Sequence, residues 1–126
     1  MKKILILSFI LASTSSFARG PHFFYCRNNS VDVSSHYIEC LQTNFARLEQ
    51  AFNGRLSLQY CDDPGTKLHV QFTNCIRQNF RAAQKQLINW GVPIYITNCY
   101  AGKTGKVLQS YQSCINNNFN AFSLVP

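Results

Sequence analysis

The chain has 126 residues, 46% of them hydrophobic, and its 12 lysines and arginines against 5 acidic residues give a formal net charge of +7. This length is typical of one domain and too short for several. The apolar runs fall short of the roughly 20 residues that cross a bilayer, so a membrane-spanning protein is not expected.

The first 18 residues have the three parts of a secretory signal peptide. Two lysines precede a short apolar run at residues 4–12, and small residues stand where a signal peptidase reads before cleaving after Ala18. We therefore expect export to the periplasm or the medium, and the short form with two lysines is typical of bacteria. Without those two lysines, residues 19–126 form one mature domain with ten basic and five acidic residues, a net charge of +5.

All six cysteines lie in the expected mature domain. An even count in an exported chain predicts disulfides. Zinc would need cysteines about two to four residues apart, but the closest pair, Cys26 and Cys40, is 14 residues apart. We therefore expect neither a metal site nor a cofactor.

One short motif occurs three times: a cysteine, an aliphatic residue, two variable residues, Asn and Phe. It reads CLQTNF from Cys40, CIRQNF from Cys75 and CINNNF from Cys114, and each of these cysteines has another one 14 or 15 residues upstream. Three copies of one unit are most simply closed within the unit, each closure being worth roughly 3 kcal/mol in the chain-entropy model. The predicted disulfides are Cys26–Cys40, Cys61–Cys75 and Cys99–Cys114.

The residues around each second cysteine indicate a helix. Apolar residues stand seven and three positions before it and one, five and eight positions after it, which traces one stripe of an α-helix. Ser30, Thr66 and Thr104 precede these stripes and are the predicted N-caps. Gly54 and Gly91 follow the first two stripes and predict C-terminal capping.

Upstream of each first cysteine the pattern changes to short extended runs. Residues 56–60 alternate between apolar and polar, residues 94–98 are β-branched and aromatic, and residues 23–25 are aromatic, so all three are predicted strands. The predicted fold is therefore α+β, or small α/β, with three tandem β-loop-α repeats of about 36 residues that share one core. The expected repeats are residues 19–54, 55–91 and 92–126.

An asparagine returns four residues after the second cysteine of every unit, at Asn44, Asn79 and Asn118. Asparagine is a poor residue for a helix interior because its amide competes with the backbone. Its return predicts a structural role, in which the amides satisfy backbone groups of a neighbouring unit. A ligand site lined by the three amides is the alternative.

Little in the sequence points to catalysis. The histidines His22, His36 and His69 lack a metal-like spacing, and Asp62 and Asp63 stand in a DDPG sequence that is ordinary for a turn. The common nucleophile, metallohydrolase and phosphate-loop motifs do not occur. We therefore expect no enzyme, with a minimal hydrolase that uses Asp62, Asp63 and a histidine as acid and base as the alternative.

Basic residues suggest a binding surface. Arg77, Arg81 and Lys85 follow at four-residue spacing beside the apolar stripe, and Arg47 of the preceding unit is expected to join them in one cationic face. Such a face fits an anionic glycan, lipid headgroups or an acidic protein, while the plain alternative is that these charges keep the domain soluble. Basic runs interleaved with aromatic residues do not occur, so nucleic acid is not the expected partner.

These features predict a non-enzymatic exported module that binds a partner protein or an anionic envelope polymer. Ser57, Gln59, Tyr95 and Thr97 are expected on a common polar side of the strands. The alternative function is a small exported cationic toxin or effector that acts on membranes or polymers.

Overall fold

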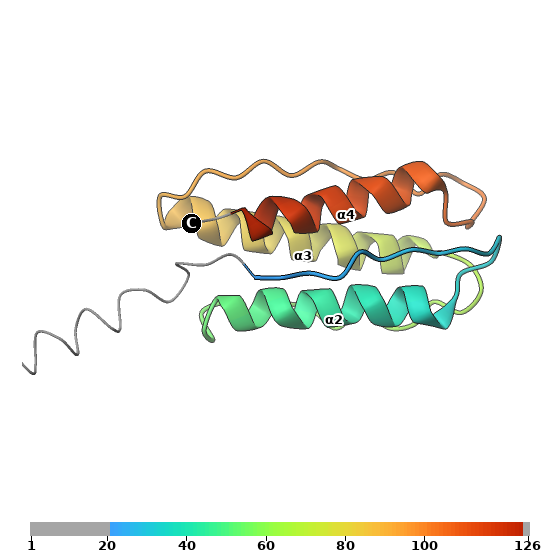
Figure 1. The fold of residues 1–126 in the computed structure, drawn as a ribbon, viewed down its shortest axis with the longest axis horizontal. Coiled ribbons are helices and arrows are strands. Elements are labelled where there is room, and N and C mark those ends of the chain that lie inside the picture. The colour runs from blue at the N-terminus through green and yellow to red at the C-terminus, as the bar shows by residue number, and fades with distance from the viewer. Residues whose placement is uncertain (1–20, 125–126) are drawn as a thin grey trace, which may run out of the picture.

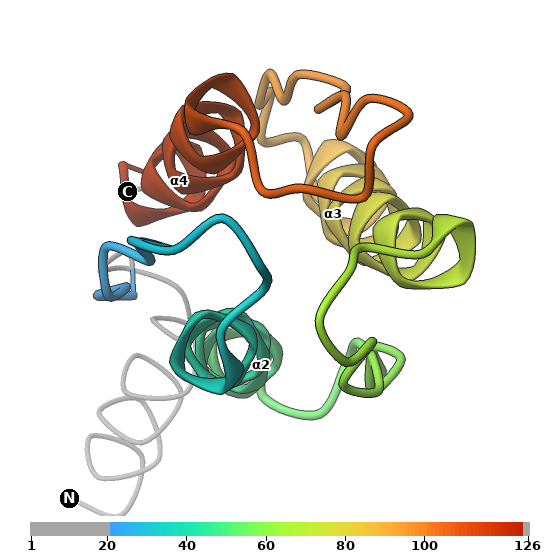
Figure 2. The ribbon, with the colours of Figure 1, turned by 90° about the vertical axis from the view of Figure 1, so that its right-hand side faces the viewer.

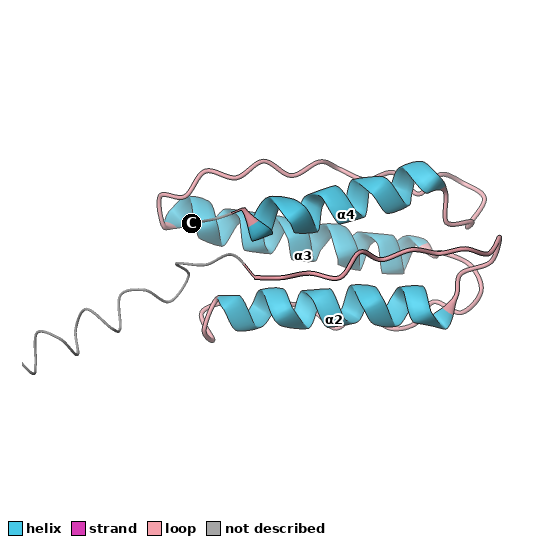
Figure 3. Ribbon diagram, in the orientation of Figure 1, coloured by secondary structure: helices cyan, strands magenta, loops and turns pink. Residues whose placement is uncertain are grey.

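The computed structural model describes residues 21–124, and the predicted signal peptide lies outside these residues. The described part contains three α-helices, which run in the same direction, and no strand (Figures 1 and 3). They are α2 (Ser35–Ala51), α3 (Val70–Asn89) and α4 (Gln109–Ser123). An extended segment runs back along each helix before it begins: segment 1 (residues 21–33), segment 2 (residues 55–68) and segment 3 (residues 92–107).

The prediction of an α+β fold is wrong for the described residues. The predicted strands at residues 23–25, 56–60 and 94–98 are extended, but they form no sheet (Figure 3). A helix lies between every two segments along their length (Figure 2), so their backbones meet only at single hydrogen bonds near the helix starts, such as that from the N–H of Val33 to the carbonyl oxygen of Thr66. An alternation of apolar and polar residues requires only an extended chain with one buried side. The segments meet this requirement without pairing into a sheet.

Seen end-on, helices and segments alternate around a closed ring (Figure 2). Segment 2 lies between α2 and α3, and segment 3 lies between α3 and α4. Segment 1 closes the ring, because side chains of both α2 and α4 bind its backbone. Each unit of one segment and one helix therefore contacts the other two units.

The repeated asparagines hold each segment against the helix of its own unit. The Asn44 side chain accepts a hydrogen bond from the N–H of Phe24 at 2.9 Å and donates one to the carbonyl oxygen of the same residue at 2.8 Å. The amide thereby supplies the pair of bonds that a neighbouring strand would otherwise supply, although it serves its own unit and not a neighbour as predicted. The equivalent pairs are Asn79 with Gln59, at 2.9 Å for both bonds, and Asn118 with Thr97, at 2.9 and 2.8 Å.

Replacing Asn79 with alanine is expected to lower the free energy of unfolding by about 1–3 kcal/mol, because both backbone groups of Gln59 lose their partner. The matched control is Asn89→Ala at the exposed end of α3, where a surface change stays within about 0.5 kcal/mol. Urea unfolding of the two variants measures the difference. Equal stabilities would contradict a structural role for the repeated asparagines.

The core lies along the axis of the ring. The phenylalanines of the repeated motif, Phe45, Phe80 and Phe119, are each at most 5% exposed and meet pairwise, with ring centroids 4.8–5.0 Å apart. Two further layers flank this aromatic contact, one turn before and one turn after it on each helix. Their buried members are Leu41, Ile76 and Ile115 in one layer and Leu48, Ala83 and Phe122 in the other.

Three disulfides tie each helix to the segment of its own unit. They join the cysteines that the repeat pairs, with Cα–Cα distances of 5.6–5.7 Å, and no described cysteine is free. Such a set of disulfides fits a protein exported to an oxidising compartment. Among the described helices, none has the length and apolar character needed to cross a membrane.

The predicted helix starts are three or four residues too early. Ser30, Thr66 and Thr104 lie in loops, and the residues that directly precede the helices are Ser34, His69 and Leu108. Ser34 does act as an N-cap, because its side chain accepts a hydrogen bond from the N–H of Tyr37 at 3.2 Å.

The loops that precede the helices hydrogen-bond to one another, so the predicted N-cap residues belong to these loops and not to the helices. The N–H of Val33 donates to the carbonyl oxygen of Thr66 at 2.9 Å, and the N–H of Leu68 donates to that of Gly105 at 2.8 Å. Val33 and Leu68 are nevertheless buried. The apolar residues seven positions before each second cysteine therefore lie in the loops and cover the end of the core. They do not belong to the helices.

Gly54 and Gly91 both adopt the left-handed conformation, with φ of 76° and 80°, but the left-handed residue that directly follows the C-cap of α2 is Asn53, with φ of 52°. After α3, the N–H of Gly91 donates to the carbonyl oxygen of Ile88 and the N–H of Val92 to that of Leu87, both at 2.9 Å. This pair of bonds is a Schellman motif. It ends α3 and turns the chain back into segment 3.

Candidate functional site

Charged residues are distributed unevenly along the chain. All five acidic side chains lie between residues 32 and 63, and the sequence of residues 64–126, which contains α3, segment 3 and α4, has none. The same sequence carries six cations and hence a net charge of +6, whereas residues 19–63 have four arginines against the five carboxylates. The six cations are Lys67, Arg77, Arg81, Lys85, Lys103 and Lys106. The repeat motif alone does not reveal this asymmetry, which becomes visible when charged residues are counted separately in the two halves of the sequence.

Three of the four predicted binding cations lie together. Arg77, Arg81 and Lys85 occupy successive turns of α3, about 6 Å apart along the helix axis. Arg81 and Lys85 are exposed, and Arg81 donates to the side-chain oxygen of Asn98 in segment 3 at 3.2 Å. Arg77 and Arg81 therefore lie at the contact between α3 and segment 3.

Arg47 lies apart from this group. Its guanidinium sits over the ring of Phe24, 4.4 Å from the centroid, and donates to the carbonyl oxygen of His22 at 3.2 Å. Both partners belong to segment 1, on the other side of α2 from α3 (Figure 2). The single cationic face that includes Arg47 is not formed.

The polar residues Ser57, Gln59, Tyr95 and Thr97 are exposed, but they do not share one side of a sheet. Segment 2 carries the first two and segment 3 the last two, with α3 between the segments (Figure 2). Tyr95 is the most exposed aromatic residue of the described chain, at 90%.

The residues of the alternative hydrolase site do come together. Asp62, Asp63 and His69 line a hollow of about 360 Å³ beside the Cys61–Cys75 disulfide. Asp63 accepts a hydrogen bond from the N–H of Gly65 at 2.8 Å, which is the turn geometry that a DDPG sequence predicts. His22 and His36 lie elsewhere, and no group of three metal-binding side chains exists among residues 21–124.

Each helix also contacts the segment of the next unit, and we call this contact a seam. The three seams use equivalent helix positions, two, six and nine residues after the second cysteine. These positions carry Gln42, Ala46 and Glu49 in the α2 seam, Arg77, Arg81 and Gln84 in the α3 seam, and Asn116, Asn120 and Ser123 in the α4 seam. The same scaffold thus presents three chemically different linings.

The first of these positions clamps the next segment in two seams. Asn116 accepts from the N–H of Cys26 and donates to its carbonyl oxygen, both at 2.8 Å, and Gln42 donates to the carbonyl oxygen of Cys61 at 2.8 Å. In the α3 seam the equivalent residue is Arg77, which has no acceptor atom. Over the described residues, no hydrogen bond joins Arg77 to the backbone of Cys99.

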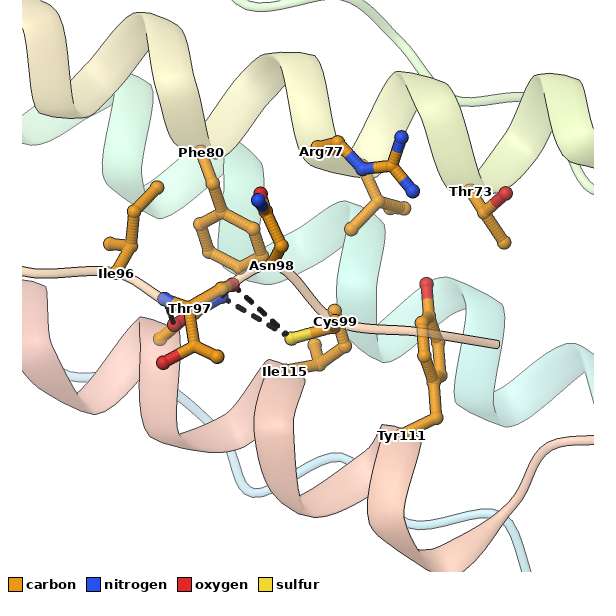
Figure 4. Close-up of a pocket in the computed structure, with 11 residues that line it drawn as sticks. Thr73, Arg77, Phe80, Ile96, Thr97, Asn98, Cys99, Tyr111 and Ile115 are labelled. Atoms are coloured by element: carbon orange, nitrogen blue, oxygen red, sulfur yellow. Dashed lines mark hydrogen bonds between the residues drawn. The ribbon is translucent and has the colours of Figure 1, made fainter. Parts of the chain in front are cut away.

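Arg77 instead lines a small hollow in the α3 seam, of about 10 Å³, together with Thr73, Cys99 and Tyr111 (Figure 4). Its Nε atom is buried and has no hydrogen-bond partner among the described atoms, while one of its terminal nitrogens donates to the side-chain oxygen of Asn74 at 3.3 Å. The Tyr111 hydroxyl points toward α3 (Figure 4).

Tyr111 stays a neutral hydroxyl in this hollow. Burial raises the pKa of its phenol above the usual range, and the nearby Arg77 guanidinium opposes that rise only in part. Tyr111 is 1% exposed, so desolvation disfavours the phenolate. The hollow therefore offers hydrogen-bond donors and positive charge.

Taken together, these residues can bind an oxyanion far better than a cation, because guanidinium and hydroxyl groups donate and no carboxylate is present on α3, segment 3 or α4. Comparison with known proteins finds no matching family model, no matching curated protein and no matching solved structure.

Proposed function

We propose that this protein is an exported, disulfide-stapled, non-enzymatic module that binds an anionic polysaccharide along α3, segment 3 and α4. The observation that carries the proposal is the charge distribution: α3, segment 3 and α4 carry five cations and no acidic side chain, and Lys67 in the adjoining loop is a sixth cation. A surface of one sign attracts an oppositely charged polymer over distances near the Debye length, about 10 Å at 0.1 M salt.

The cations form a row that suits a linear polymer. Arg77, Arg81 and Lys85 follow α3 at intervals of about 6 Å. The row continues at the N-terminal end of the helices, where the loop of Lys67 meets the loop that carries Lys103 and Lys106, because the N–H of Leu68 donates to Gly105. A polymer with regularly spaced anionic groups neutralises several of these cations at once.

Exposed tyrosines favour a polysaccharide over other anionic polymers. Tyr95 and Tyr100, both in segment 3, are 90% and 82% exposed. A tyrosine combines a flat apolar ring with a hydroxyl at its edge, and a sugar ring has the same combination of an apolar face and a hydroxylated edge. The closed ring and its disulfides hold these side chains in place before binding, which lowers the entropic cost of association.

Retention on immobilised heparin and on polygalacturonate tests the proposal. The wild type is expected to bind both at low salt and to elute as the Debye length falls toward about 3 Å at 1 M. Arg81→Glu/Lys85→Glu is expected to weaken binding at least about tenfold, because two attractive contacts become repulsive. Folding stays nearly intact, since exposed charges contribute little to stability.

The matched control is Arg27→Glu/Arg47→Glu, which makes the same change in net charge on segment 1 and α2. It is expected to weaken binding no more than about threefold, because long-range charge alone is screened. Failure of the wild type to bind either polymer at low salt would refute the proposal. Leakage of phosphatidylglycerol vesicles without polymer binding would favour the cationic effector instead.

A further inference from the structure

We infer that the hollow in the α3 seam is a subsite for a single oxyanion group of the polysaccharide, a carboxylate or a sulfate, held by Arg77 and the backbone of Cys99. This inference rests on the proposed function, since it names the place where one charged group of the polymer is bound. The row of exposed cations attracts the polymer, and this subsite would select the chemistry of its substituents.

The first argument comes from comparing the seams. Cys26 and Cys61 turn backbone groups toward the helix of the preceding unit, where Asn116 and Gln42 bind them at 2.8 Å. The same register turns the backbone of Cys99 toward α3. An arginine there cannot accept from the N–H of Cys99, so Arg77 does not form the clamp that Asn116 forms on Cys26.

The second argument is the state of Arg77 itself. Its Nε atom is buried without a partner among the described residues, and an unsatisfied buried donor is costly. An oxyanion supplies the missing acceptor and matches the planar fork of a guanidinium, which binds carboxylate and sulfate through two parallel bonds. The same oxyanion is expected to lie within reach of the N–H of Cys99, which is equivalent to the Cys26 N–H that Asn116 binds in the α4 seam.

The size of the hollow decides which part of a polymer enters. Its volume of about 10 Å³ equals roughly one water-sized probe. A sugar ring does not fit, but one oxygen of an exocyclic carboxylate or sulfate does. Thr73 and Tyr111 line the same space, and the Tyr111 hydroxyl adds a further donor (Figure 4).

Charge around the hollow favours an anion. Arg81 lies one turn further along α3 and donates to the side chain of Asn98, which lines the hollow, so a second cation lies close to it. The helices and the segment that form the seam contribute no carboxylate. A neutral sugar would leave both guanidinium groups without a counter-charge.

Arg77→Gln is the decisive variant, because it installs the residue that Gln42 provides in the α2 seam. The new amide is expected to bind the carbonyl oxygen of Cys99, so the melting temperature should stay the same or rise. Affinity for polygalacturonate or heparin, measured by titration calorimetry, should fall about tenfold with the loss of a charge-assisted bidentate contact. Arg77→Lys keeps the charge without the fork and should still lose about threefold.

The matched control is Arg81→Gln, which removes the same charge from an exposed position and should cost only about twofold. Equal losses in Arg77→Gln and Arg81→Gln would overturn the subsite while the proposed function stands. If the wild type binds no polymer, the proposed function itself fails. Should Arg77→Gln not fold, the Arg77→Lys loss carries the same test.

A separate melting experiment uses inorganic sulfate at concentrations matched to those of the anionic groups in the polymer. Sulfate is expected to raise the melting temperature of the wild type less than the polymer does and to leave Arg77→Gln unchanged. Sulfate that binds as tightly as the polymer would overturn the assignment to a polysaccharide substituent and leave a site for a free anion.

Discussion

Phe80→Ala is expected to lower the free energy of unfolding by about 3–5 kcal/mol. Phe80 is 2% exposed, and its ring meets those of Phe45 and Phe119 with centroids 5.0 and 4.8 Å apart. The cavity would open at the axis where all three units meet. Each helix is tied to a segment by a disulfide, so the helices cannot readily move inward to fill the cavity. The free energy of unfolding should therefore fall by most of the cost of the cavity.

Chemical unfolding of oxidised protein measures this loss. The control is Tyr95→Ala, which removes an aromatic ring that is 90% exposed and should change stability by no more than about 0.5 kcal/mol. A loss below about 1 kcal/mol in Phe80→Ala would mean that the three phenylalanines do not form the centre of the core.

Removing one disulfide should also have a large effect. The double variant Cys61→Ala/Cys75→Ala is expected to lose about 3 kcal/mol, the chain-entropy value for a loop of about 15 residues. Cys61 is 4% exposed, and its sulfur lies 3.5 Å from the amide nitrogen of Asn79. The substitution therefore also removes a contact of the asparagine that holds segment 2.

The other two disulfides serve as internal controls. They close loops of nearly the same length, with sequence separations of 14 and 15 against 14 for Cys61–Cys75. Their removal should cost the same within about 1 kcal/mol, because the entropic term depends only weakly on loop length. A disulfide whose loss changes nothing would show that its unit is held by packing alone.

Part of the candidate site was readable from the sequence and part was not. The spacing of Arg77, Arg81 and Lys85 placed them on one helix, since positions four apart share a helix face. The hollow beside Arg77 was not readable, because it is made by segment 3 and α4 as well as α3. The separation of Arg47 likewise follows from its contact with segment 1.

The sequence by itself determined the pairing of the cysteines, the buried faces of the three helices and the glycine that ends α3. These features depend on spacing within one unit of about 36 residues, and the threefold repeat makes that spacing visible. The extended character of residues 56–60 was equally local, because alternation of apolar and polar residues reflects only one buried side.

Tertiary structure alone decided that these extended segments form no sheet. An extended chain must satisfy its backbone groups, and the sequence does not state whether the partner is another strand or a side chain. Here the partner is the repeated asparagine, which occupies both groups of residues such as Phe24. With a helix on either side of every segment, no sheet forms, and the units close into a ring in which the buried Nε atom of Arg77, in the α3 seam, has no hydrogen-bond partner among the described atoms.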